Sequence, residues 1–311
     1  MKKSGGICLV GLFAVSLGAV VLGRALFGFA ERPSMPTAAS SASHYGARRR
    51  PLVMAHRGGG GLWPENTLHA FTQAAAMGVD VLEMDLHATA DGHLVVIHDG
   101  TLDRTTNGTG RVNMLALAEV KKLDAGYHWT KDGGRTYPFR GRGLSVPTLP
   151  EVLARFPDMR FNLDIKQAQP SLVKSFCQTL REGRAARRVI VGSFSSQAIT
   201  EFRRECPEVP TSASPDDLRA LLVGGDAARN IPSDTPLPMR ALQVPEYAGG
   251  LLLLEASFVE AAHRRGLEVH VWTINDEEGM RRVLALGVDG IITDYPNVLI
   301  ELLNRREPPR K

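Results

Sequence analysis

From residue 51 onward, the apolar positions of the chain alternate between two periods. Short runs rich in Val, Ile and Leu are separated by longer stretches in which apolar residues recur every three to four positions. The first pattern is typical of buried strands and the second of amphipathic helices. We expect strands at residues 52–56, 79–86, 160–165, 189–194, 210–213, 241–244, 267–274 and 290–293. We expect helices at residues 70–77, 171–182, 198–204, 257–265 and 277–285.

This alternation predicts an α/β protein with a single (β/α)8 TIM barrel over residues 51–305. Eight strands with intervening helices in a body of about 250 residues fit that fold. The active sites of such barrels lie at the carboxyl ends of the strands, which form the mouth of the barrel. Polar residues at or just after strand ends are therefore the candidates for chemistry.

One further apolar run, residues 93–98, is expected to form a hairpin with the second strand. Asp91 and Gly92 are a two-residue turn signal, because a type I′ turn needs positive φ at both central positions. A turn centred there places His98 directly opposite Asp85. We expect the hairpin to project beyond the mouth and to return a histidine to a carboxylate there.

Residues 99–147 lack a clear strand–helix rhythm and contain several glycines. A connection of this length without regular elements is uncommon inside a compact domain and is often functional. We expect a small inserted lobe at the mouth that shapes a substrate pocket.

The N-terminal segment has a different pattern. Lys2 and Lys3 precede an uncharged, mostly apolar run at residues 7–23. A basic start with an apolar run of this length is typical of both a signal peptide and a membrane anchor. We expect one of these over residues 1–30 and a flexible Ser-, Ala- and Pro-rich linker over residues 31–50. Both place the body outside the cytoplasm, as a membrane-anchored or a secreted or periplasmic protein.

The charge distribution argues against a nucleic-acid partner. The formal net charge is +4, but the first 50 residues contain seven basic side chains and one acidic side chain. The remaining 261 residues contain 30 basic and 32 acidic side chains. Because the basic excess lies in the leader, the folded body lacks the basic surplus that nucleic-acid binding requires.

Three cysteines are too few for a disulfide framework. Cys177 and Cys206 are able to pair if the body is exported. We expect them to be two unpaired, partly buried thiols.

Carboxylates recur with a two-residue spacing on two predicted strands. Glu83 and Asp85 face the same way because strand side chains alternate. Two adjacent carboxylates need a cation or a shared proton to offset their repulsion, and Ca²⁺ or Mg²⁺ takes oxygen ligands of this kind. Asp164 and Lys166 repeat the spacing on the next barrel strand. They supply a third candidate metal ligand and a cation for an anionic substrate.

Basic and imidazole groups close the first strand. His56 and Arg57 are followed by four glycines, residues 58–61. An arginine fork matches phosphate oxygens, and a glycine-rich turn lets a ligand approach the backbone. With His98 on the neighbouring hairpin, two imidazoles are available as general base and general acid beside a metal-bound phosphate.

In their order and spacing, the motifs of the chain resemble the glycerophosphodiester phosphodiesterase family. They are His56-Arg57-Gly58, Glu65-Asn66-Thr67, Glu83-x-Asp85, His98-Asp99, Asp164-x-Lys166, Ser193-Phe194, Val271-Trp272-Thr273-Ile274-Asn275 and Thr293-Asp294-Tyr295-Pro296. The resemblance covers residues 52–303. It implies a metal-dependent (β/α)8 hydrolase that cleaves glycerophosphodiesters to glycerol 3-phosphate and an alcohol.

The resemblance also implies roles for individual residues. His56 and His98 match the acid–base histidines of the family, and Arg57 matches its phosphate-binding arginine. Lys166 matches a lysine near the phosphate, and Trp272 an aromatic residue at the pocket wall.

For the metal, Ca²⁺ or Mg²⁺, the resemblance implies Glu83 and Asp85 as ligands. Asp164 stands where many members have a glutamate, and His98 is an alternative ligand because of its expected place beside Asp85. We interpret Asn66, although part of a family signature, as the N-cap of the following helix.

Two other functions remain open. A membrane-attached branch of the family includes lysophospholipase D enzymes, which release the head group of lysophospholipids, and the leader, the insertion and residues 162–166 are compatible with it. An inactive, membrane-tethered domain that binds phosphate or lipid belongs to another class. It is disfavoured because both histidines and all three carboxylates are present. The expected partners are thus a small-molecule or lysolipid phosphodiester, and a membrane through the N-terminal segment.

Overall fold

A computed structural model describes residues 50–223 and 237–306. The predicted leader and nearly all of the predicted linker lie outside these ranges. Within them, no helix is both long enough and apolar enough to cross a membrane.

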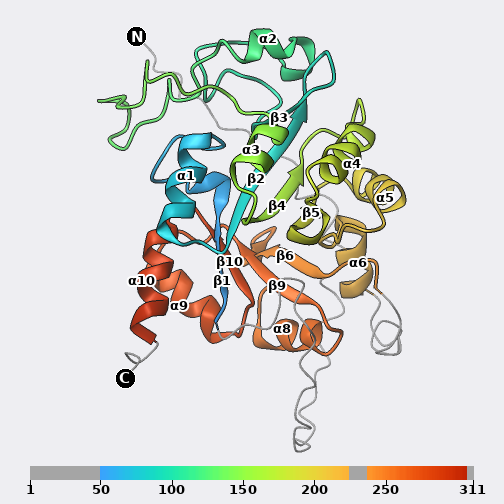
Figure 1. Ribbon diagram of the computed structural model, residues 1–311. Helices are drawn as coiled ribbons and strands as arrows, with labels where there is room; N and C mark the ends of the chain where they lie inside the picture. Colours follow the sequence, from blue (N-terminus) through green and yellow to red (C-terminus); the bar gives the residue numbers. More distant parts are fainter. Residues whose placement is uncertain (1–49, 224–236, 307–311) are drawn as a thin grey trace, which may run out of the picture.

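Parallel strands form a nearly closed barrel, as the sequence pattern predicts (Figure 1). In chain order they are β1 (Leu52–Ala55), β2 (Val81–Ala88), β4 (Arg160–Ile165), β5 (Val189–Gly192), β6 (Ala241–Pro245), β9 (Glu268–Trp272) and β10 (Gly290–Thr293). Their spatial order is β5-β4-β2-β1-β10-β9-β6.

The eighth expected strand, residues 210–213, fills the gap between β5 and β6 with isolated bridges only. Thr211 pairs with Val191 of β5, and Ser212 pairs with Ala241 of β6, both in parallel. The extended segment therefore closes the barrel without forming a full strand, and the (β/α)8 prediction is confirmed.

Helices cover the outside of the barrel (Figure 1). They are α1 (Leu68–Met77), α3 (Leu149–Arg155), α4 (Val173–Glu182), α5 (Ser196–Glu205), α6 (Pro215–Val223), α8 (Ala256–His263), α9 (Glu277–Ala285) and α10 (Pro296–Arg306), with short 3-10 turns at His56–Gly58 and Ala186–Arg188. Several begin at a polar cap: the side chains of Thr67, Ser195 and Asp276 each accept a hydrogen bond from a backbone N–H of the first turn. Their apolar faces pack on the strands, and all five helices expected from the sequence are present.

Side chains fill the barrel interior below the mouth. Leu52, Met54 and Ile292 belong to a buried apolar cluster inside it. Next to them, the Gln243 amide donates to Asn162 Oδ1 at 3.0 Å. A ligand therefore reaches the barrel from its open end, at the carboxyl ends of the strands.

The predicted hairpin is present, but its register differs from the prediction by one residue. Strand β3 (Leu94–Val96) pairs with β2 so that Leu86 faces Val96 and Ala88 faces Leu94. Ile97 N donates to Asp85 O, so His98 is not directly opposite Asp85 and the expected pairing is wrong.

The side chain of Thr89 explains the shift. Thr89 Oγ1 accepts from His93 N, and Thr89 N donates to His93 O, which makes these two residues a pair. The loop then has three residues, 90–92, with Gly92 in the left-handed region at φ +82°. This is the three-residue hairpin loop with glycine at its last position, and it moves every later pair by one.

Residues 99–147 form a lobe around the outer end of the hairpin, at the top of Figure 1. It contains a 3-10 turn, Val112–Met114, and the short helix α2 (Leu117–Val120). Its apolar cluster includes Leu102, Val112 and Val120 together with Val95 and Ile97 of the hairpin segment. The lobe therefore shares an apolar cluster with the hairpin, and Trp129 Nε1 also ties it to the barrel by donating to Gly60 O at 3.1 Å.

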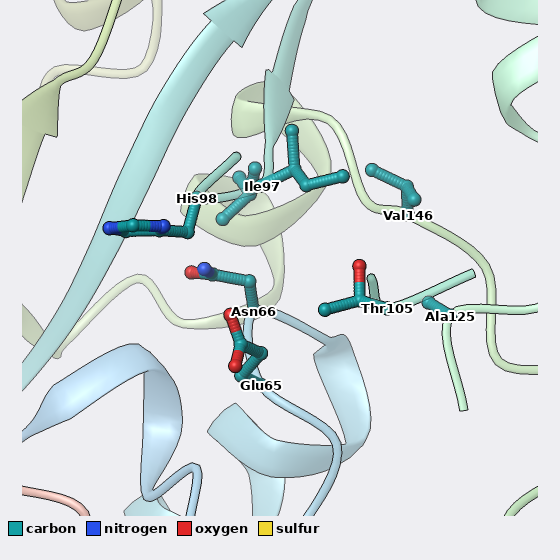
Figure 2. A pocket seen from close by; sticks show the side chains of 8 residues that line it. Glu65, Asn66, Ile97, His98, Thr105, Ala125 and Val146 are labelled. Atoms are coloured by element: carbon teal, nitrogen blue, oxygen red, sulfur yellow. The ribbon is translucent and has the colours of Figure 1, made fainter. Parts of the chain in front are cut away.

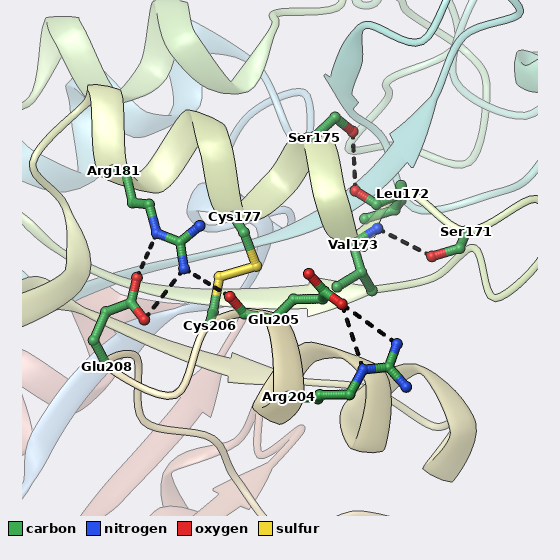
Figure 3. The surroundings of a disulfide bond; sticks show 10 residues. All are labelled: Ser171, Leu172, Val173, Ser175, Cys177, Arg181, Arg204, Glu205, Cys206 and Glu208. Atoms are coloured by element: carbon green, nitrogen blue, oxygen red, sulfur yellow. Dashed lines mark hydrogen bonds and ion pairs between the residues drawn. A yellow bond between two sulfur atoms is a disulfide. The ribbon is translucent and has the colours of Figure 1, made fainter.

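Cys177 of α4 and Cys206, which follows α5, form a disulfide with 5.8 Å between the Cα atoms (Figure 3). The expectation of unpaired thiols is therefore wrong. The two helices already pack through Phe176 and Phe202, whose ring centroids are 5.2 Å apart. That contact brings together two cysteines that are 29 residues apart in the sequence.

Candidate active site

His56 is oriented by a carboxylate from the far end of the chain. Ala55 of β1 is in register with Thr293 of β10, so the next residues, His56 and Asp294, emerge side by side. His56 Nδ1 lies 2.7 Å from Asp294 Oδ1, and Asn275 Nδ2 donates to Asp294 Oδ2 at 2.7 Å. Because an ionised carboxylate only accepts, Nδ1 carries the proton and Nε2 is left for chemistry.

The same contacts set the charge of this pair. Burial lowers the pKa of His56, but the hydrogen bond to Asp294 and the nearby Glu83 carboxylate outweigh burial, and the net pKa is raised. Burial raises the pKa of Asp294, yet His56 and Asn275 bring it below its usual value. Asp294 therefore stays ionised and favours the protonated imidazole.

Arg57, the residue after His56, has a left-handed backbone conformation with φ +52°. Its backbone N–H donates to Glu83 Oε2 at 2.7 Å, and its Nη1 donates to Glu65 Oε1 at 2.9 Å. The buried Nε makes no hydrogen bond with a described residue and is 3.4 Å from Asp85 Oδ2. Gly58, at φ +81°, is needed next because a Cβ there would be 2.8 Å from the Phe71 ring.

The two predicted carboxylate pairs meet across neighbouring strands. Asp85 of β2 is in register with Asp164 of β4. Lys166 Nζ lies 2.6 Å from Asp164 Oδ2 and 3.2 Å from Asp85 Oδ1. Burial lowers the pKa of Lys166, but the two carboxylates raise it well above its usual value. The lysine therefore remains an ammonium ion.

Burial raises the pKa of both carboxyls of β2, but the neighbouring charges give the two groups opposite net shifts. It raises the pKa of Asp85, but Lys166 and Arg57 lower it to about 2. Burial and the neighbouring Asp85 charge raise the pKa of Glu83 to about 7. Glu83 is thus the carboxylate of this cluster that lacks a sufficient counter-charge.

The donor set fits a hard cation. The buried Asp164 Oδ1 accepts no hydrogen bond from a described residue, whereas the buried Asp85 Oδ1 faces the Lys166 ammonium at 3.2 Å. A buried oxygen without a partner is costly unless a cation or donor satisfies it. The carboxyl of Glu83 is on the same strand as Asp85. Among the described residues, no three His, Cys, Asp or Glu side chains are already placed around a common ion position. Lys166 lies between Asp85 and Asp164.

His98, like His56, forms a hydrogen bond with a carboxylate. Its Nδ1 lies 2.6 Å from Asp99 Oδ1, which again leaves Nε2 free. Arg104 donates to Asp99 Oδ2 at 2.7 Å and to both oxygens of Glu65. Since Glu65 also accepts from Arg57, a continuous chain of ion pairs links His98 to Arg57.

A pocket lies beside His98, between the barrel and the lobe (Figure 2). Glu65, Asn66 and His98 line one side of it, and Ala125 and Val146 of the lobe line the other. The lobe therefore shares a pocket with one of the candidate catalytic histidines, as expected for an insertion at the mouth.

Asn66 has a different role from the predicted one. The N-cap of α1 is Thr67, whose side chain accepts from Ala70 N. Asn66 is buried in the left-handed region at φ +56°, and its Nδ2 donates to Asp85 Oδ2 at 2.8 Å. Asparagine tolerates this backbone conformation, which turns the amide toward Asp85. The N-cap interpretation was wrong by one residue, and Asn66 orients a candidate metal ligand.

Trp272 lies at the mouth, at the end of β9. Its ring meets that of Phe194 edge to face, with 5.5 Å between centroids. The Lys166 ammonium lies 5.2 Å from the centre of the Phe194 ring. An aromatic wall thus stands next to the charged cluster.

The structure brings together all the candidate site residues around the mouth and adds others. Asp294, Asn275, Glu65 and Arg104 were assigned no role from the sequence. The register of β1 with β10 is the signal that would have identified Asp294. Ala55 pairs with Thr293 at the mouth, so Asp294 is the neighbour of His56.

Comparisons with known proteins agree with this geometry. The family model described as "Glycerophosphoryl diester phosphodiesterase family" matches residues 56–298. A glycerophosphodiester phosphodiesterase of Caldanaerobacter subterraneus is 34% identical over 82% of this chain and 99% of its own length. Lysophospholipase D GDPD1 of Rattus norvegicus is 29% identical over 81% of this chain and 85% of its own length.

A solved structure has the same fold. It is an Oleispira antarctica phosphodiesterase in complex with the product sn-glycerol-3-phosphate, with a TM-score of 0.65 and 25% identity, covering 82% of this chain and 97% of that one. From the matched family region and the 34% identity over nearly a whole relative, the chain belongs to the glycerophosphoryl diester phosphodiesterase family of hydrolases.

Proposed function

We propose that this protein hydrolyses glycerophosphodiesters to glycerol 3-phosphate and an alcohol, with His56 and His98 as its acid–base pair and a divalent cation as its cofactor. One observation carries the proposal. Each histidine is held through Nδ1 by its own carboxylate, Asp294 or Asp99, so both have Nε2 available at the mouth that contains Arg57.

In the proposed reaction, the nucleophile is water or the glycerol hydroxyl of the substrate. The Nε2 of one neutral imidazole takes the proton of the nucleophile, while the oxygen of the nucleophile bonds to phosphorus. The other imidazolium gives its proton to the oxygen of the departing alcohol as that P–O bond breaks. If the glycerol hydroxyl attacks, the cyclic phosphate that results is opened by water with the two roles reversed.

The cations of the cluster bind and orient the phosphate. Arg57 holds its guanidinium beside Glu65 and Asp85, and the forked geometry of such a group matches phosphate oxygens. Lys166 is a fixed ammonium beside the same carboxylates. Both groups favour a dianionic transition state over the monoanionic substrate.

Glu83, Asp85 and Asp164 would hold the cation, Ca²⁺ or Mg²⁺. When bound, the ion would neutralise phosphate charge and polarise the P–O bonds. The buried Asp164 Oδ1, which accepts no hydrogen bond from a described residue, supports this assignment.

The test uses the full chain, stripped of metal and then supplied with Mg²⁺ or Ca²⁺, with glycerophosphocholine as substrate. We expect turnover to return with the metal. His56→Ala should lower kcat by roughly 10²–10⁴-fold while substrate affinity changes little. Wild-type turnover in His56→Ala would contradict the two-histidine scheme, and binding without turnover in the parent chain would identify an inactive phosphate-binding domain.

A lysophospholipase D activity is a second candidate. The similarity to the rat enzyme of that name and the aromatic wall of Phe194 and Trp272 beside Lys166 favour it. Glycerophosphocholine and lysophosphatidylcholine run side by side would distinguish the two activities by the ratio of their kcat/KM values.

We also propose that the barrel functions outside the cytoplasm, secreted or attached to a membrane through its N-terminal segment. The Cys177–Cys206 disulfide supports this location, because such bonds persist in oxidising compartments. Cell fractionation, with protease added to intact cells, tests it: a protein that stays protected and reduced would contradict the location.

A further inference from the structure

The exposed large apolar side chains of the described residues gather at one end of the barrel. Six of the seven belong to segments that follow strands at the mouth, or to the lobe: Met114, Phe194, Tyr247, Leu251, Leu252 and Tyr295. The seventh, Leu222, is near the end of α6, which runs antiparallel to the strands and so ends on the opposite side. Exposed apolar groups gathered on one face mark an interaction surface, whereas scattered ones do not.

The most prominent of these groups lie on a small hairpin after β6, formed by β7 (Tyr247–Ala248) and β8 (Leu251–Leu252). Tyr247 is 54% exposed and Leu251 is 43% exposed. The base of the hairpin is fixed, because the Glu246 carboxylate accepts two hydrogen bonds from Arg282. A firmly held base that presents apolar side chains to solvent is typical of an element that binds something.

The hairpin is continuous with the candidate active site. Pro245, two residues before Tyr247, is in register with Trp272, which packs on Phe194. Phe194 is half exposed and lies 5.2 Å from the Lys166 ammonium. An apolar strip therefore runs from the phosphate-binding cluster to the tip of the hairpin.

The lobe adds positive charge to this end of the molecule. Residues 99–147 contain eight Lys or Arg and five Asp or Glu, a net charge of +3 in a body whose net charge is negative. Six of the eight are exposed and make no ion pair with a carboxylate of a described residue: Arg111, Lys122, Lys131, Arg135, Arg140 and Arg142. Unpaired basic side chains of this kind are attracted to an anionic membrane surface.

We infer that the mouth end of the barrel docks on an anionic phospholipid surface, with the β7–β8 hairpin entering the interface and the basic lobe contacting the head groups. Apolar insertion and electrostatic attraction are the two contributions that drive interfacial binding. Docking would place the mouth against the surface from which a lysophospholipid is taken. This substrate source rests on the proposed function, whereas the docking itself does not.

The experiment places a tryptophan on the hairpin of the full chain. Leu251→Trp adds one fluorophore to the three native tryptophans, none of which lies in the first 50 residues, and Leu222→Trp is the matched control on the opposite side. Each variant is mixed with vesicles of phosphatidylglycerol and phosphatidylcholine whose acyl chains carry bromine, which quenches nearby indoles. We expect the added emission of Leu251→Trp to be quenched at least three-fold more than that of Leu222→Trp, and high salt to reduce the difference.

Equal quenching of the two variants on vesicles that the protein binds would overturn the inference. A blue shift of Leu251→Trp emission that grows with protein concentration in the absence of lipid would also overturn it. That result would show that the β7–β8 hairpin lies in an interface between two copies of the chain. A second measurement uses Leu251→Ser/Leu252→Ser against Leu222→Ser. The double variant should lose about ten-fold of its turnover of lysophosphatidylglycerol in vesicles and keep its turnover of soluble glycerophosphocholine. If no variant turns over either substrate, the proposed function fails while the quenching result still decides the docking.

Discussion

His56 and Asp294 each follow one member of the Ala55–Thr293 pair, which joins the parallel strands β1 and β10. His56 Nδ1 and Asp294 Oδ1 are 2.7 Å apart. The two residues are 238 positions apart in the sequence. The closure of the barrel between β1 and β10 thus supplies the carboxylate that orients His56, one of the two proposed catalytic histidines.

Asp294→Asn should reduce kcat by roughly 10²–10⁴-fold. The carboxylate that fixes the Nδ1–H tautomer of His56 is lost, and the asparagine amide does not fix it. It should also move one limb of the pH–rate profile. Asp294 contributes to the raised pKa of His56, so its neutralisation lowers that pKa and shifts the limb to lower pH. A shifted acidic limb identifies His56 as the base, and a shifted alkaline limb identifies it as the acid.

The control is Asp289→Asn, which removes a carboxylate that pairs with His263 near the start of β10, away from the mouth. It should leave both limbs in place. A profile of Asp294→Asn that coincides with the parent profile would show that Asp294 has no part in setting the charge of His56.

Arg104 is expected to be a positioning residue for His98 and Arg57. It bridges Asp99 and Glu65, and it helps hold the pKa of Asp99 well below its usual value, after the larger effect of the hydrogen bond from His98. Arg104→Met should lower kcat by about ten-fold or more, with a smaller effect on KM, and Arg104→Lys should recover part of the loss. Arg111→Met, in the same lobe, is the control.

A purely structural role for Arg104 would lower thermal stability without this kcat effect. Steady-state kinetics and a melting curve on the same preparations separate the two cases. Loss of activity that follows the loss of folded protein would rule out positioning.

The sequence predicts those parts of the site that follow from strand periodicity. Glu83 and Asp85 share a face because side chains alternate along β2, and the equivalent spacing in β4 places Asp164 in register with Asp85. These relations need only a local pattern and the rule that parallel strands end together.

The parts that the sequence does not predict depend on contacts between distant segments or on one side chain. Thr89 forms a side-chain bond that sets the hairpin loop to three residues, and a one-residue change in register moves His98 away from Asp85. The pairing of Cys177 with Cys206 depends on how α4 packs on α5, which no local pattern specifies.

Metal binding is expected to depend on pH through Glu83. Burial and the Asp85 charge raise the pKa of Glu83 to about 7, so at acidic pH a proton occupies the carboxyl that we propose as a metal ligand. Mg²⁺ or Ca²⁺ should therefore raise the Tm of the metal-stripped chain more at pH 8 than at pH 6. Without metal, the protonated Glu83 carboxyl contributes to the free energy of unfolding, and this contribution is lost as pH rises from about 4.5 through 7.

Glu83→Gln tests this dependence directly. The variant should lose most of the metal-induced rise in Tm, as well as its difference between pH 6 and pH 8. Glu151→Gln, at the start of α3, is the control for removal of a carboxylate elsewhere. A metal-induced rise that is the same in parent and Glu83→Gln would place the cation at other residues.

The disulfide should stabilise the barrel without taking part in the chemistry. Cross-linking residues 29 positions apart restricts the unfolded chain by roughly 3–4 kcal/mol. A reductant should therefore lower the Tm of the parent chain and leave that of Cys177→Ser/Cys206→Ser unchanged. Because Phe176 and Phe202 still pack α4 on α5, and both cysteines lie outside the mouth, the double variant should keep its kcat below its own melting temperature. A parent Tm that does not respond to reductant would show that the thiols are unpaired in the folded protein.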